Sequence, residues 1–364
     1  MKAAILLASA SIAGCGDDAA PDSGPDAGGV DAALPADASV PDADGEDAGD
    51  GGSTDAAPDQ GVDAAPERPC DGPPGLYVDA ACQRLARDLA AYDPQFWLWS
   101  DGTDKERYIA LPEGATIDAS RPDGWVFPVG TRVYKTFLLE GVRLETRYFE
   151  KVREDEGIGA WEMRTYAWNE AQDRAVEVTE GATDVLGTGH DIPAVALCAH
   201  CHAGGGQPDV LLGFSALQLN HSGSALSLDG LNAAGVLAPP VSPAQADIPS
   251  TDPTVRAALG YLHANCGHCH GGFVPRAGLE LFVRSGLPSL EETGVYRSAV
   301  GRPSAWTAPG ATLRVAPGDP DGSTLTRRMG MRGSAQMPPL ATERIDPTGL
   351  EAVRAWIAAL PVGG

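Results

Sequence analysis

Two pentapeptides, Cys198-Ala-His-Cys-His202 and Cys266-Gly-His-Cys-His270, decide how this 364-residue chain is to be interpreted. Each matches C-x-x-C-H, the pattern of covalent c-type haem attachment. Two thiols three positions apart lie on one side of a helical turn, where each can form a thioether to one edge of a porphyrin. The histidine that follows is then placed to bind the iron as its proximal ligand. The pattern predicts two covalently bound c-type haems, with Cys198, Cys201, Cys266 and Cys269 as attachment sites and His202 and His270 as axial ligands.

Zinc is the alternative occupant of these motifs, because paired C-x-x-C sequences also hold zinc. However, 64 residues separate Cys201 from Cys266, well beyond the loop of a compact zinc ribbon. Both motifs also carry a terminal histidine that a zinc site does not require. The spacing therefore favours haem over zinc.

The start of the chain indicates export. Met1-Lys2 precedes an apolar run from Ala3 to Ala13, and Ile12-Ala-Gly-Cys15 resembles a bacterial lipobox. A short charged start, an apolar stretch and small residues are typical of a signal peptide, here residues 1–14. We expect Cys15 to be lipidated and to anchor a periplasmic or cell-surface lipoprotein to a bacterial membrane. An ordinary signal peptide with a chance cysteine is the alternative. No later stretch is long and apolar enough to span a bilayer.

Two further cysteines, Cys70 and Cys82, lie twelve positions apart. In the oxidising compartment that export implies, they are expected to pair as a disulfide. Two free thiols are the alternative. With lipid at Cys15 and haem at the two motifs, these assignments account for all seven cysteines.

The segment after the signal peptide, residues 15–69, differs in composition from the rest of the chain. Residues 16–68 consist almost wholly of Asp, Ala, Pro, Gly and Ser, and carry −14 of the formal net charge of −24. Such a segment cannot bury enough apolar surface to fold, so we expect a disordered tether. The acidic balance also argues against nucleic acid as a partner.

The remainder predicts an α+β protein, with an antiparallel β-rich domain over residues 70–190. Apolar and polar residues alternate along 142–148 and 161–165, as in strands, and Glu140-Gly141 lies where a hairpin turn is expected. The aromatic side chains are expected in the core of this domain; they are Trp97, Trp99, Trp125, Trp161 and Trp168.

The chain becomes mainly helical after this domain. Residues 191–250 form the first haem-binding segment, and 251–364 are expected to form a class I-like cytochrome c domain. Asp252-Pro253 and Asp346-Pro347 each predict a helix start, and Met337-Pro-Pro-Leu340 lies between these helices. In this order Met337 is the expected distal ligand of the second haem, which would raise its reduction potential. Met329 and Met331 are weaker candidates because they lie in an expected helix.

The distal ligand of the first haem stays open. No methionine lies between positions 203 and 328. The remaining candidates are Met163, His190, His221 and His263, or no ligand at all. Each also has an ordinary structural interpretation, as a core or loop residue.

The ordered set of motifs resembles a family of exported bacterial dihaem c-type cytochromes with a β-rich N-terminal half. The resemblance covers about residues 75–360 and rests on stretches such as 98–102 (Leu-Trp-Ser-Asp-Gly), 125–128 (Trp-Val-Phe-Pro) and 166–169 (Tyr-Ala-Trp-Asn), together with both haem motifs. It implies dihaem electron transfer, with the attachment sites and axial ligands named above. It assigns no substrate.

These observations favour a membrane-anchored dihaem cytochrome that exchanges electrons with an unidentified redox partner protein in the cell envelope. A dihaem redox enzyme of the peroxidase type, with an open first haem, is the alternative. A third hypothesis is a surface-binding lipoprotein in which the β domain acts and the metal is structural.

Overall fold

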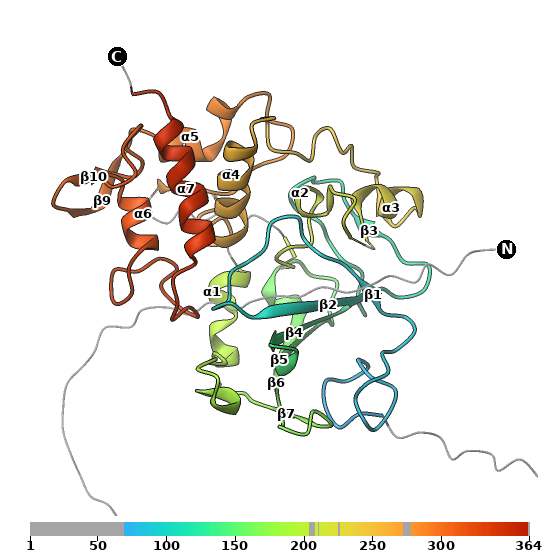
Figure 1. The fold of residues 1–364 in the computed structure, drawn as a ribbon. Coiled ribbons are helices and arrows are strands. Elements are labelled where there is room, and N and C mark those ends of the chain that lie inside the picture. Colours follow the sequence, from blue (N-terminus) through green and yellow to red (C-terminus); the bar gives the residue numbers. More distant parts are fainter. Residues whose placement is uncertain (1–68, 204–207, 210, 225, 272–277, 363–364) are drawn as a thin grey trace, which may run out of the picture. The chain divides into compact units, whose positions relative to one another are not determined.

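An antiparallel sheet of six strands forms the centre of the structure, a computed structural model that describes residues 69–203, 208–209, 211–224, 226–271 and 278–362. The signal peptide, Cys15 and the acidic segment expected at 1–68 lie outside these residues. The strand order is β1-β2-β4-β5-β6-β7 (Figure 1). The bounds are Ala90–Ala91 (β1), Asp104–Ala110 (β2), Arg132–Leu139 (β4), Val142–Lys151 (β5), Trp161–Trp168 (β6) and Ala175–Glu177 (β7).

The expected hairpin joins β4 to β5. Glu140 and Gly141 both have positive φ, 50° and 83°. This is the backbone that a two-residue hairpin turn requires. The strands pair in register from Arg132↔Glu150 to Phe137↔Glu145, after which a bulge shifts the pairing. The predicted antiparallel β region is therefore confirmed.

One face of the sheet is covered by the segment before β1. Tyr134, Tyr148 and Trp168 on this face pack with Leu76 and Tyr77 in one core cluster.

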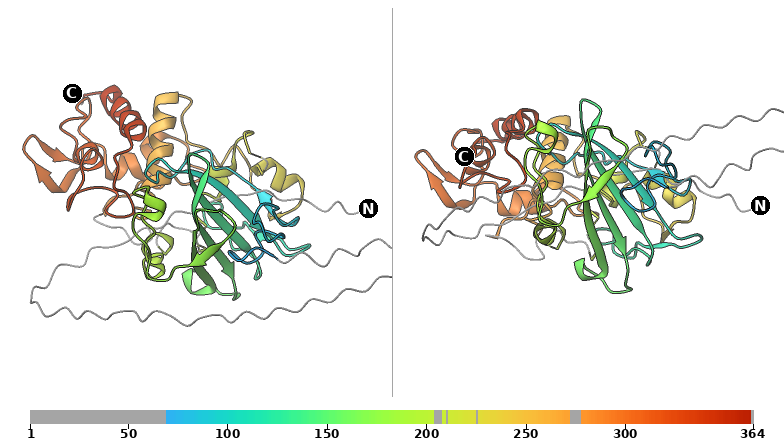
Figure 2. Two further views of the ribbon diagram at one scale, coloured as in Figure 1. Left: turned by 60° about the horizontal axis from the view of Figure 1, so that its bottom comes forward. Right: turned by 90° about the horizontal axis from the view of Figure 1, so that it is seen from below.

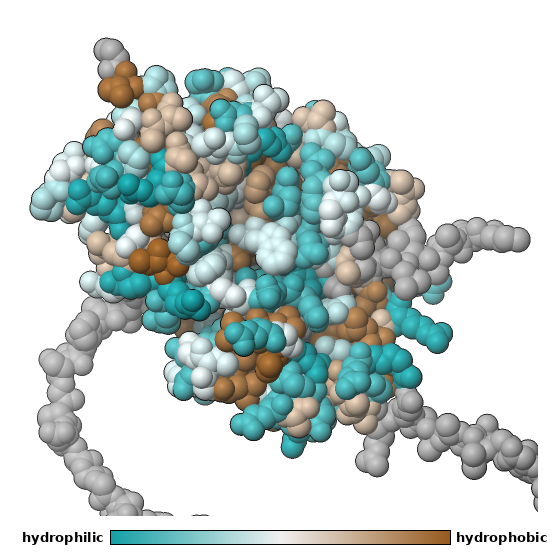
Figure 3. All heavy atoms as spheres, viewed as in Figure 1, coloured by the Kyte–Doolittle hydropathy of each residue, from teal (hydrophilic) through white to brown (hydrophobic). Residues whose placement is uncertain are grey.

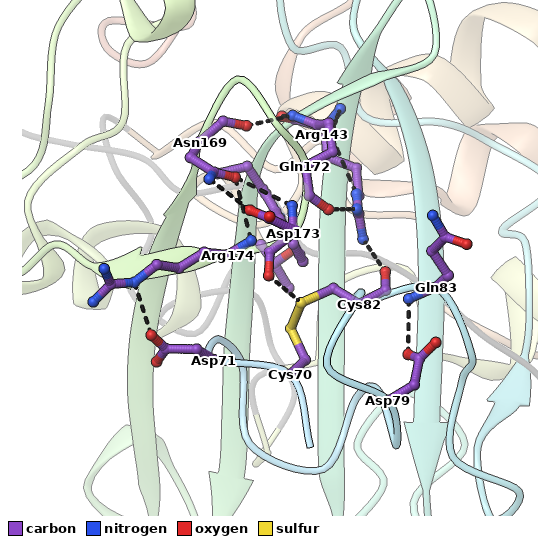
Figure 4. Close-up of a disulfide and its surroundings, with 12 residues drawn as sticks. Cys70, Asp71, Asp79, Cys82, Gln83, Arg143, Asn169, Gln172, Asp173 and Arg174 are labelled. Atoms are coloured by element: carbon purple, nitrogen blue, oxygen red, sulfur yellow. Dashed lines mark hydrogen bonds and ion pairs between the residues drawn. A yellow bond between two sulfur atoms is a disulfide. The ribbon is translucent and has the colours of Figure 1, made fainter. Parts of the chain in front are cut away.

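The disulfide Cys70–Cys82, expected from the sequence, closes this segment (Figure 4). Arg143 donates to the carbonyl oxygen of Cys82 (2.7 Å), and Arg174 pairs with Asp71 (2.7 Å). The segment is thereby attached to the strands beside it.

The other face of the sheet packs against the chain from 211 to 246. Phe214 lies at the centre of this core, with the rings of Tyr92, Trp125 and Phe127 at 4.4, 5.8 and 5.5 Å from its own. Helices α2 (Ala216–Leu219) and α3 (Leu228–Ala233) belong to this region, and so does β8 (Leu237–Ala238), which pairs with β3 (Ile117–Asp118).

Of the five tryptophans expected in the core, Trp125, Trp161 and Trp168 are buried there and Trp99 is partly buried. The prediction is wrong for Trp97. It is 46% exposed. Its ring lies 4.3 Å from the guanidinium carbon of Arg107, so it covers a buried cation rather than joining the apolar core.

Two helices with predicted starts pack side by side in the C-terminal part (Figures 1 and 2). Asp252 accepts hydrogen bonds from Thr254 N (2.7 Å) and Val255 N (3.3 Å) at the start of α4 (Pro253–Asn265). Asp346 accepts one from Gly349 N (2.9 Å) at the start of α7 (Pro347–Ala359). Both are N-caps followed by proline, as predicted. The other elements here are α5 (Gly294–Ser298), α6 (Thr324–Met329), β9 (Pro303–Ala308) and β10 (Ala311–Leu313).

The surface seen in Figure 3 mixes hydrophilic and hydrophobic side chains, with the hydrophobic ones in separate small patches. Across the described ranges, no helix has the length and apolar character needed to cross a bilayer.

Candidate functional site

The first motif forms a short helix beside the sheet. A 3-10 turn (Val195–Leu197) leads into α1 (Ala199–His202), and His202 N donates to Cys198 O (3.0 Å). The two cysteines and His202 are buried, and the His202 ring lies 4.9 Å from that of Phe149 on β5. The sheet therefore positions the first motif through an aromatic contact.

The second motif continues directly from α4. Cys266 N donates to Leu262 O (2.9 Å), and His270 N donates to Cys266 O (2.8 Å). Leu281 N in turn donates to His270 O (2.7 Å). The motif is a tight turn anchored at both ends, with its two thiols separated by two residues of that turn.

The fold brings the two motifs side by side. The Cys269 thiol donates to the carbonyl oxygen of His200 (3.7 Å). One ligand atom each of Cys201, His268 and Cys269 also lies within 4.8 Å of the others. The 63 residues between the motifs therefore fold so that the second motif lies against the first. The sequence did not predict this contact.

A cavity of about 240 Å³ opens at the second motif. Cys266, Cys269 and His270 line it, and so does Met337 with the two prolines that follow. The remaining lining is mostly apolar. This donor set fits a haem held by two thioethers with histidine and methionine as axial ligands. Of the first motif, His200 alone lines this cavity, so the same fit is not established for the first haem.

The methionine loop is fixed by hydrogen bonds on both sides of Met337. Met337 N donates to Arg328 O (2.9 Å), and the Gln336 side chain donates to the carbonyl oxygens of Pro338 and Thr342 (3.0 Å each). Met329, the last residue of α6, lines the same cavity. The expected helix does not include Met331, because α6 ends at Met329.

The thiols of the two motifs are buried or partly buried. Cys198, Cys266 and Cys269 are free thiols. Burial raises the pKa of Cys198, and it raises that of Cys266 to about 12.

The three histidines considered for the first haem all use a ring nitrogen elsewhere. Nε2 of His190 lies 2.9 Å from Glu145 Oε1, and Nε2 of His221 lies 2.7 Å from the carbonyl oxygen of Asp93. Nδ1 of His263 accepts from Val283 N (3.1 Å). The contacts found for these rings include none with His202 or with the cysteines of the first motif.

Met163 is the candidate that strand pairing places beside a residue in contact with the first motif. It pairs directly with Phe149, whose ring contacts His202. Directly paired residues point to the same face of a sheet. Met163 therefore lies on the face that carries the first motif, while the distal ligand itself stays undetermined.

The cavity also contains residues that sequence reasoning missed. Arg314 and Arg328 line it, and Trp306 does so from β9, with its ring 5.6 Å from the Arg328 guanidinium carbon. His268, the third residue of the second motif, lines it as well. Both motifs have histidine as their third residue, His200 and His268. This recurrence is the only signal in the sequence that could have indicated any of these cavity residues.

Comparison with protein-family models, with curated proteins and with solved structures gave no match. The site is therefore interpreted from its own geometry.

Proposed function

We propose that this chain is an exported electron-transfer protein that carries a c-type haem on each of its C-x-x-C-H motifs. The observation that carries the proposal is the cavity shared by Cys266, Cys269, His270 and Met337, residues up to 71 positions apart in the sequence. If the C-x-x-C-H sequence were a chance match, there would be no reason for a methionine followed by two prolines to line the same cavity.

Each residue of the second site has a distinct role in this proposal. Cys266 and Cys269 hold the porphyrin edge, and His270 is the proximal ligand. Gln336 holds the loop that presents Met337. A bound haem supplies reversible one-electron chemistry between Fe(II) and Fe(III), and the apolar lining excludes water from it.

The contact between the two motifs supports electron exchange between them. Because the Cys269 thiol reaches the backbone of His200 (3.7 Å), the two attachment sites are neighbours. Electrons would pass between the two haems and then to or from a redox protein in the cell envelope, with a lipid on Cys15 holding the chain at a membrane.

Haem content tests this proposal. We expect the protein, exported in a host that attaches c-type haem, to show a c-type α band in its reduced-minus-oxidised absorption spectrum and a mass increase of two haems. Cys266→Ala/Cys269→Ala should lose one haem, and Cys70→Ala/Cys82→Ala, the matched pair outside the motifs, should lose none. A correctly exported and folded protein without covalent haem would contradict the proposal.

A second candidate function is a bound metal ion. The cluster of Cys201, His268 and Cys269 supports it, because cysteine and histidine are the ligands that zinc prefers. Elemental analysis of the exported protein separates the two: one zinc per chain with no haem would favour the metal site, and iron equal to the haem content would favour the cytochrome.

A further inference from the structure

Three buried polar side chains line one small cavity of about 20 Å³. Ser215 and Gln218 belong to the chain that packs against the sheet, and His263 lies on α4, three positions before Cys266. These three residues are 5%, 2% and 6% exposed. Polar groups buried to this extent are nearly always hydrogen-bonded, so the polar atoms of each side chain need partners.

The hydroxyl of Ser215 has no such partner. Ser215 precedes α2, and a serine oxygen in this position commonly accepts from a backbone N–H of the helix. Ser215 makes no bond of this kind. Among the described residues, its buried Oγ has no hydrogen-bond partner at all. The protein therefore leaves one hydroxyl unsatisfied in a residue that lines the cavity.

His263 offers a donor. Its Nδ1 accepts from Val283 N (3.1 Å), so Nδ1 carries no proton. Burial lowers the pKa of His263 to about 3, which keeps the ring neutral. A neutral imidazole has one protonated nitrogen, so the proton lies on Nε2. Within the part of the chain that the structure describes, Nε2 makes no hydrogen bond, and it is a donor without an acceptor.

Gln218 offers a second donor. Its Oε1 accepts from Phe96 N (3.0 Å), which fixes the orientation of the amide group. The amide nitrogen, Nε2, makes no hydrogen bond with any described residue. Two donors cannot satisfy each other, so Nε2 of Gln218 and Nε2 of His263 both require a group that accepts.

A single water molecule meets these requirements. About 10–15 Å³ of such space holds one water, so a cavity of about 20 Å³ has room for one and for nothing larger. Water accepts from two donors and still donates to a hydroxyl oxygen, and buried waters typically make about three hydrogen bonds. None of the described residues that line the cavity is Asp, Glu, Lys or Arg. A small ion would therefore lie there without a counter-charge.

We propose that this cavity is a binding site for one buried water molecule, held by Ser215, Gln218 and His263. The water accepts from Nε2 of His263 and from Nε2 of Gln218, and it donates to Oγ of Ser215. It joins the chain that covers the sheet to the helix that leads into the second motif. Both ring nitrogens of His263 are then in use, so His263 has none left for the iron of a first haem.

A crystal structure of the full exported chain, from crystals soaked in sodium bromide, tests the occupant. We expect density for one water within hydrogen-bonding distance of the three side chains, without anomalous scattering from bromide at that position. An empty cavity would overturn the site, and so would a bromide ion in it.

Ser215→Ala tests the hydrogen bonds in solution, because a hydrated cavity and an empty one predict opposite effects. With a bound water the variant loses one hydrogen bond, so we expect its unfolding equilibrium constant to rise about fivefold. In an empty cavity the same variant removes an unsatisfied hydroxyl, which would stabilise the protein. Urea unfolding measures the difference, with the exposed Ser222→Ala as the matched control. Unchanged or increased stability of Ser215→Ala would overturn the proposal.

A double-mutant cycle tests the bridge itself. No hydrogen bond joins the side chains of Ser215 and His263 among the described residues, so they interact through the shared water. We expect Ser215→Ala/His263→Phe to lose less stability than the sum of the two single variants. Additive losses would overturn the bridge. These outcomes are separate from the haem proposal, because the three side chains include no attachment cysteine and no assigned axial ligand.

Discussion

Asp209→Asn is the substitution whose cost follows most directly from the structure. Asp209 lies seven residues after His202, and its side chain is fully buried. Its carboxylate accepts from Lys151, Phe127 N and Trp161 Nε1. Asparagine has nearly the same size, but its NH2 group cannot accept a hydrogen bond, so one of the three donors loses its acceptor. The Lys151 ammonium also loses its counter-charge.

Removal of one partner of a buried ion pair costs about 3–5 kcal/mol, because the other charge stays buried and unpaired. For a folded region of this size, about 2 °C of melting temperature is lost per kcal/mol. We therefore expect Asp209→Asn to lower the melting temperature by roughly 6–10 °C.

Urea unfolding followed by circular dichroism measures the loss of free energy, and thermal unfolding measures the shift in melting temperature. Asp321→Asn is the matched control, since Asp321 pairs with Arg354 at the surface (2.9 Å) with its own side chain 79% exposed. Exposed pairs contribute about 0–1 kcal/mol. Equal losses in the two variants would refute the reasoning. In the double variant Lys151→Met/Asp209→Asn, part of the loss should be recovered.

Three further predictions concern the haem ligand, the packing of α4 and the buried lysines. Met337→Ala should lower the reduction potential of one haem, whereas Met329→Ala, from the same cavity, should leave it nearly unchanged; a spectroelectrochemical titration in which Met329→Ala has the larger effect would reassign the ligand. Gly260→Ala should destabilise the protein by about 1–3 kcal/mol in urea unfolding, because its new Cβ would lie 2.1 Å from the Phe96 ring; an unchanged midpoint would contradict this contact. The unfolded chain keeps a proton on Lys105 up to pH 10.5 that the folded chain releases near pH 7. Stability should therefore rise with pH between 7 and 10.5, with Lys105 contributing at most about 1.4 kcal/mol per pH unit. Burial lowers the pKa of Lys135 as well, so a pH series with Lys105→Met should show a smaller rise, and an unchanged rise would contradict the reasoning.

Local signals in the sequence were sufficient to predict several elements. Asp252-Pro253 and Asp346-Pro347 each combine an N-cap with a residue suited to the first helical turn, and both helices begin there. Glu140-Gly141 likewise placed the hairpin. These features depend on residues within one turn of each other, so they need no knowledge of the tertiary fold.

The burial of the sheet could not be predicted in the same way. Alternation along 142–148 correctly indicated a strand, but both Glu145 and Thr146, which face opposite sides, are fully buried. A period of two identifies two faces without stating what covers each. The contact between the two motifs could not be predicted either, because it depends on how the 63 residues between them fold.

Lys151 and Lys135 are buried in two different ways on one face of one sheet. A lysine kept only for packing would be matched by a carboxylate, as Lys151 is by Asp209, or replaced by methionine at lower cost. Lys135 has neither solution among the described residues, and Lys105 has only a backbone oxygen. Burial instead lowers the pKa of both lysines, to about 7 for Lys105 and well below the ordinary value for Lys135. The sheet therefore accommodates Lys151 by pairing its charge, and Lys135 by favouring loss of its proton.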